Sequence, residues 1–167
     1  MKILETDRLV LRHFDTRDAE FILELINEPG WHRFIGDRGV RTLEAARDYI
    51  VNVPMAMYQR NGFGLYAVEL RDDGTLVGMC GLIKREGLDD VDIGFAILER
   101  HGRKGYAHES ASAVMGHARQ LGLTRIVAIT SVDNHASMRL LESIGMRFER
   151  MVTLPGGTEE IRMFATG

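Results

Sequence analysis

The first quarter of the chain shows a short alternating apolar pattern followed by helical spacing. Leu9 and Leu11 share one face of an alternating stretch, which predicts a strand ending near Phe14. Apolar residues at helical spacing then predict a helix over residues 15–26, with Asn27 to Gly30 as its stop. The pattern therefore predicts a strand that leads directly into a helix.

A second helix is predicted to start at about Thr42, where apolar positions again follow the helical period. Pro54 lacks a backbone donor, so it should break or kink this helix before a short continuation to Arg60. Strand and helix patterns alternate after this point. Strands are predicted at residues 63–71, 75–85, 91–98, 125–130, 147–154 and 160–166, and helices at residues 107–121 and before Gly145.

This order of elements predicts an α+β fold. The strands at 63–71 and 75–85 form a hairpin around the turn at Asp72, Asp73 and Gly74. Residues 91–130 form one β-α-β crossover, which should pair two parallel strands through a helix. The chain has no repeat, low-complexity stretch or linker, so we expect a single domain over residues 1–167.

Composition narrows the function classes. The chain is 45% hydrophobic and 27% charged, typical of a globular protein, and its net charge of -3 provides no field for nucleic acid. The charged start predicts no secretory signal, and no apolar run could span a membrane, so we expect a cytoplasmic protein. Cys80 lies in an apolar strand pattern and is predicted to be a buried thiol.

A glycine-flanked basic loop joins the strand at 91–98 to the helix at 107–121. Gly102 and Gly105 flank Arg103 and Lys104. A strand-to-helix joint of this kind points free backbone N–H groups and the positive end of the helix outward, which suits a pyrophosphate. The spacing alone also fits a solvated basic loop, and it does not match the GxxxxGK[ST] or GxGxxG patterns of nucleotide-binding loops.

The order of motifs resembles the GNAT superfamily of acetyltransferases. Four segments occur in the order that is typical of this family: the strand DIGFAIL, the loop GRKGYA, the strand AITSVDN and the helix SMRLLESIGM. The opening ETDRLVLR and the N-x-x-S-x-x-L-L-E-x-x-G-M segment are similar to the RimJ/RimL-like branch, with Met146 in place of the usual Phe. The resemblance implies a mostly antiparallel sheet flanked by about four helices, and an acetyl-CoA-dependent N-acetyltransferase.

The resemblance also implies a cofactor site. Backbone amides of Gly102, Arg103, Lys104, Gly105, Tyr106 and Ala107 would wrap the pyrophosphate of acetyl-CoA. Gly102 stands where the family usually has Gln or Arg, which leaves Arg103 and Lys104 as the side-chain candidates. An amide among Phe95, Ala96 and Ile97 would hold the oxyanion, and Gly94 is expected to form a bulge that frees it.

Candidate catalytic groups follow from the chemistry of thioester aminolysis. Asp92 or Glu69 could deprotonate the amine through water, although strand carboxylates are usually surface groups and water alone could suffice. The family's tyrosine acid is replaced by Leu141. Ser137 is the candidate to hydrogen-bond the thiolate beside Asn134, with helix capping as its alternative role.

The resemblance implies that the acceptor binds between the first two helices, where the family lines its acceptor pocket and where this chain has Trp31, His32, Arg33 and Phe34. Packing of an inter-helix loop is the alternative role of these residues. It would be an amine on a peptide N-terminus, an amino acid or a small molecule. The six histidines show no metal-ligand spacing, so no metal is expected. A non-catalytic acyl-CoA sensor and a nucleotide-binding protein are the alternative functions. A homodimer is left open.

Overall fold

One sheet forms the centre of the structure, a computed structural model that describes residues 1–166. Its eight strands lie in the order β1-β2-β3-β4-β5-β6-β8-β7. They are β1 (Lys2–Glu5), β2 (Leu9–Arg12), β3 (Leu65–Leu70), β4 (Leu76–Ile83), β5 (Val91–Ile97), β6 (Ile126–Thr130), β7 (Arg147–Val152) and β8 (Ile161–Ala165). Neighbouring strands are antiparallel except β5 and β6, which confirms the predicted α+β fold with one crossover.

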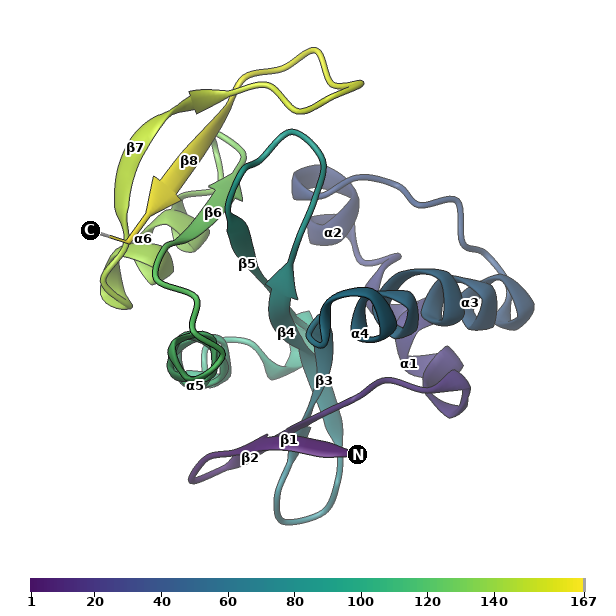
Figure 1. Cartoon of the computed structure of the whole chain (residues 1–167). Helices are drawn as coiled ribbons and strands as arrows, with labels where there is room; N and C mark the ends of the chain where they lie inside the picture. Colours follow the sequence, from purple (N-terminus) through teal and green to yellow (C-terminus); the bar gives the residue numbers. More distant parts are fainter. Residues whose placement is uncertain (167) are drawn as a thin grey trace.

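Helices cover both faces of this sheet (Figure 1). They are α1 (Ala19–Leu25), α2 (Pro29–Phe34), α3 (Leu43–Ile50), α4 (Ala56–Asn61), α5 (Tyr106–Gln120) and α6 (His135–Ser143). Figure 1 shows α5 and α6 on one side of the sheet and α1 to α4 on the other. Residues 1–166 thus hold six α-helices where about four were expected.

Part of this difference arises at Pro54. Thr42 caps α3 through a bond from Ala45 N to its hydroxyl, and the chain then widens into a π-helical turn over Val51–Met55. Pro54 lies inside this turn, and α4 continues to Asn61. The wider turn accommodates the ring and the missing N–H of proline. The predicted interruption and continuation are therefore confirmed.

The sequence patterns missed two elements, β1 and α2. Strand β1 is a short edge strand that ends in charged residues, and it pairs with β2 through a turn that contains no glycine. Helix α2 begins at Pro29, which had been interpreted as a stop. Proline is favoured at the first position of a helix, where its missing N–H would have no partner in any case. The same residue can therefore end one helix and start the next.

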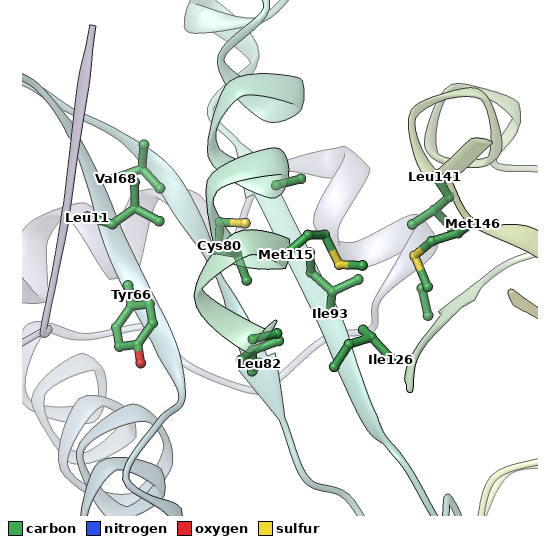
Figure 2. Close-up of a cluster of buried hydrophobic side chains, with 14 of the residues drawn as sticks. Leu11, Tyr66, Val68, Cys80, Leu82, Ile93, Met115, Ile126, Leu141 and Met146 are labelled. Atoms are coloured by element: carbon green, nitrogen blue, oxygen red, sulfur yellow. The ribbon is translucent and has the colours of Figure 1, made fainter. Parts of the chain in front are cut away.

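Two main apolar clusters fill the space between the sheet and its helices. Under α5 and α6, buried side chains from the sheet meet Val114, Met115 and Leu141, and Figure 2 shows part of this cluster. On the other face, α1, α2 and α3 contribute Ile22, Trp31 and other side chains that pack with β3 to β5. The helices are thereby fixed on the sheet on both sides of β5, the strand that leads into the basic loop.

The central strands should tolerate little loss of volume. Leu82 on β4 is completely buried (Figure 2), whereas Leu121 at the end of α5 is 43% exposed. We expect Leu82→Ala to lower the free energy of unfolding by about 2–5 kcal/mol. Leu121→Ala, the matched control, should lower it by about 1 kcal/mol or less. Urea unfolding measures both, and equal losses would contradict the packing described here.

Candidate functional site

The parallel strands β5 and β6 diverge soon after they meet. Their ladder contains only the pairs Val91–Ile126 and Asp92–Val127, although β5 continues to Ile97. Because the two strands run in the same direction, they are joined at their amino ends and open at their carboxyl ends. We call this opening the fork. A ligand that enters the fork would meet backbone N–H and C=O groups that lack a strand partner.

The backbone of β5 presents its free groups to the fork. Leu98 N donates to Val77 O at 2.8 Å, so alternate residues before it also bond to β4. The backbone groups of Phe95 and Ile97 therefore point the opposite way, toward β6. The pairing of β4 with β5 passes through Gly94 without a register shift, so the bulge expected there is wrong. Divergence of β6, not a bulge, frees these amides.

The basic loop lies at the open end of the fork. A short 3-10 turn, Glu99–His101, follows β5, and Gly102 N donates back to Glu99 O at 3.0 Å. Arg103 and Gly105 both have left-handed backbones, with φ of 61° and 82°. Arg103 and Lys104 are exposed, which surrounds the joint with positive charge.

Gly105 is the N-cap of α5, and no side chain within the described residues 1–166 caps this helix. Glu109 N is bonded to Gly105 O, so the N–H groups of Tyr106 and Ala107 precede the first such bond of the helix. These N–H groups and the positive end of a 15-residue helix are available to an anion. The structure thus contains the strand-to-helix joint that the sequence predicted between β5 and α5.

Helix α6 begins just beyond the other prong of the fork. Asn134 caps it by accepting from Ser137 N at 3.2 Å, so the cap uses the Asn134 side chain and the Ser137 backbone. The half-buried Ser137 hydroxyl is not the capping group. His108 Nδ1 and Ser143 Oγ, 3.0 Å apart, hold α6 against the start of α5. Leu141 is buried in the core (Figure 2).

Helix α2 bridges the two prongs on the opposite face. Glu28, just before α2, accepts from Glu99 N with oxygens at 3.1 and 3.3 Å. At the other end of α2, Ser131 Oγ donates to Phe34 O at 3.2 Å. Arg33, beside Phe34, also pairs with Asp133 at 3.2 Å.

Of the four predicted acceptor residues, Arg33 and Phe34 thus contact the open end of the fork. Trp31 is buried, and within residues 1–166 its indole N–H has no hydrogen-bond partner. His32 lies beside Asn27, with its Nε2 3.3 Å from Asn27 Oδ1.

The two candidate bases, Asp92 and Glu69, lie away from the open end of the fork. Asp92 belongs to the last residue pair before the strands diverge, is 1% exposed, and binds Arg85 through two hydrogen bonds of 3.0 Å. Burial raises the pKa of the Asp92 carboxyl, and the pairing with Arg85 opposes that rise. Glu69 is on β3, two strands from β5, and pairs with Arg12 at 3.1 Å. Both carboxylates thus have guanidinium partners.

The structure also bears on a nucleophilic cysteine, a metal site and a membrane span. Cys80 is buried as expected, and burial raises the pKa of its thiol to about 12, so it is not a ready nucleophile. No group of three or more His, Cys, Asp or Glu in residues 1–166 is placed to hold a metal. Among the same residues, no helix is long and apolar enough to cross a membrane.

Three residues at the loop had not been singled out from the sequence. Thr6 and Arg8 bind Glu109 in the first turn of α5, and Arg8 also binds the carbonyl of Lys104. Thr6 and Arg8 belong to the opening segment ETDRLVLR, which was identified from the sequence, but the sequence did not indicate that this segment binds Glu109. They lie about a hundred residues before Glu109. No local spacing could have revealed that contact.

Known proteins share both the sequence pattern and this fold. The family model described as an acetyltransferase (GNAT) domain matches residues 8–147. An uncharacterized N-acetyltransferase of Bacillus subtilis, YoaA, is 35% identical over 149 residues, which cover 88% of this chain and 84% of YoaA. A GNAT-family acetyltransferase of Bacillus anthracis is 27% identical, with a TM-score of 0.80 and coverage of 99% and 97%.

RimL, described as a ribosomal L7/L12 alpha-N-protein acetyltransferase and solved in complex with coenzyme A, has the same fold. Its TM-score is 0.83 at 21% identity, with coverage of 99% of this chain and 97% of RimL. With the family model over most of its length and the close relative in Bacillus subtilis, this chain belongs to the GNAT family of acetyltransferases.

Proposed function

We propose that this acetyltransferase moves an acetyl group from acetyl-CoA to a primary amine by direct attack of the amine on the thioester. The observation that carries the proposal is the fork, with an uncapped, glycine-rich helix start at its open end. The pantetheine chain would lie along the free backbone of Phe95 and Ile97, and the pyrophosphate would rest on the amides of residues 102–107.

The reaction needs a place for the negative charge on the tetrahedral intermediate. The amide of Phe95 or Ile97 would supply a rigid donor, because β5 is bonded to β4 on its other edge; the Ala96 amide, named as a candidate from the sequence, faces β4 and is not free. The leaving thiolate has a conjugate acid with a pKa near 8.5, so it departs without full protonation. Ser137, whose hydroxyl is not used for the cap, would donate a hydrogen bond to that sulfur.

The acceptor is proposed to be an α-amine, such as a peptide N-terminus. At pH 7 roughly a tenth of α-amines are neutral, against fewer than about one lysine side chain in a thousand. RimL is described as an alpha-N-protein acetyltransferase, which supports the same class of acceptor here. Trp31, Arg33 and Phe34 would line the entry, because α2 bridges the two prongs of the fork.

One assay tests the whole proposal. Purified chain with acetyl-CoA is offered a panel of N-terminal peptides, amino acids, polyamines and lysine peptides blocked at the N-terminus, and free thiol is measured. We expect thiol release that depends on the amine, fastest with peptide N-termini. Binding of CoA with no release for any amine would instead favour a sensor. Preference for ATP over CoA would favour a nucleotide-binding protein.

The cofactor loop is tested by adding bulk and charge. Gly105 has φ of 82°, which side chains rarely adopt, so a glutamate there would strain the loop and add bulk and negative charge at the start of α5. We expect Gly105→Glu to abolish measurable CoA binding in calorimetry. Gly122→Glu is the matched control, since Gly122 also has positive φ but ends α5. A folded Gly105→Glu variant with unchanged affinity would rule out the loop.

Ser137 should matter only modestly. Because thiolate is already a good leaving group, Ser137→Ala should lower kcat by more than about twofold and less than about a hundredfold, the upper limit being about 2.7 kcal/mol. Ser112→Ala, on the exposed side of α5, is the control. Since Asn134 provides the cap, Ser137→Ala leaves helix α6 capped. No loss, or a loss above that limit, would contradict the assigned role.

Asp92 is proposed to help through water. Burial raises the pKa of the Asp92 carboxyl above its ordinary value, which makes its carboxylate a stronger base than an exposed one. We expect Asp92→Asn to lower kcat/KM by about ten- to a hundredfold at pH 7, with a loss that shrinks as pH approaches the amine pKa.

Asp90→Asn is the matched control for Asp92, because Asp90 pairs with Arg125 at 2.9 Å just before β5. A pH-rate profile for both variants separates a relay from a structural ion pair. A loss in Asp92→Asn that is the same at every pH would show that its pairing with Arg85 supports only the fold.

A further inference from the structure

The turn between β1 and β2 is fastened directly to the cofactor loop. The Glu109 carboxylate, 19% exposed in the first turn of α5, accepts from Thr6 Oγ1, from Arg8 N at 3.0 Å and from Arg8 Nε at 2.6 Å. Three donors on one carboxylate define a fixed geometry. The edge of the sheet is thus joined to the start of the helix that would receive the pyrophosphate.

Arg8 holds the loop as well as the helix. While its Nε binds Glu109, its Nη1 donates to Lys104 O at 2.7 Å. Its guanidinium also lies over the Tyr106 ring, 4.7 Å from the centroid. One planar group therefore sets the distance between the loop and the first turn of α5, which a lysine ammonium could not do.

The bond to Lys104 O also orients the next amide. The Lys104 carbonyl and the Gly105 N–H belong to one trans peptide, so they point in opposite directions. With the carbonyl turned toward Arg8, the Gly105 N–H points away from it. If this peptide flipped, a carbonyl oxygen would take the place of the donor and repel a phosphate.

Gly105 fits this arrangement in a second way. A Cβ at Gly105 would lie 3.2 Å from Arg8 Nη2, closer than an ordinary contact. Glycine is thus favoured both by the positive φ and by the approach of the guanidinium. The absence of a side chain at position 105 of the loop thus leaves room for the Arg8 guanidinium of the N-terminal segment.

We propose that Arg8 is a positioning residue for acetyl-CoA, which holds the Lys104–Gly105 peptide with its N–H facing the pyrophosphate, and that Thr6 and Glu109 hold Arg8 in place. The inference rests on the proposed function. It assigns no contact between Arg8 and the reacting atoms. Its consequence is a loss of cofactor affinity, and not of the chemical step, when the guanidinium geometry is lost.

Arg8→Lys tests the geometry because it keeps the positive charge. We expect the Kd for CoA and the KM for acetyl-CoA to rise about tenfold or more, since two charge-assisted hydrogen bonds to the loop and helix are lost. The kcat should stay within about twofold of the unmodified chain. In the free protein, amide hydrogen exchange should quicken over residues 103–109.

Arg17→Lys is the matched control. Arg17 is 89% exposed on its side chain and also binds a carboxylate, that of Asp15, through Nε and Nη2, but it does not touch the loop. It should leave the Kd, the KM and exchange at 103–109 unchanged. Glu109→Gln keeps the shape of the side chain and should raise the Kd less than Arg8→Lys does.

The outcomes separate this inference from the proposed function. If the unmodified chain binds CoA and Arg8→Lys binds it equally well, the role of Arg8 is overturned alone. A fall in kcat with KM unchanged, or weaker binding without faster exchange at 103–109, also overturns it. No CoA binding by the unmodified chain would overturn the proposed function, and the inference with it.

Discussion

The early divergence of β5 and β6 is the constraint on which the rest of the site depends. Two parallel strands that stayed paired would satisfy their backbone groups and leave no slot between them. Because pairing stops at Asp92 and Val127, the amides of Phe95 and Ile97 keep free donors inside a rigid sheet. The loop after β5 and helix α6 after β6 are then both carried to the open end.

Helix α2 and the basic loop both lie at the open end of the fork, on opposite sides of it. Contacts of Glu28 with one prong and Phe34 with the other place α2 across the opening, on the face away from α5. A cofactor that enters beside α5 and an amine that enters beside α2 would therefore meet within the sheet. In the proposed function, this arrangement would bring the two substrates together.

Local signals predicted much of this fold. The period of α5, the glycines of the loop and the interruption at Pro54 are each contained in a few residues. The fork was not predictable in this way, because strand pairing depends on residues that are distant in the sequence. A bulge at Gly94 was instead expected to free the β5 amides, and the pairing of β4 with β5 contains no such bulge. The contact of Arg8 with Glu109 was missed for the same reason.

Amide hydrogen exchange of the chain with and without CoA tests the central claim most directly. CoA should slow exchange at Phe95 and Ile97 in the fork and at Tyr106 and Ala107 in the loop together, while ATP at the same concentration should not. Protection of the loop without the fork, or of neither while CoA is bound, would contradict the account.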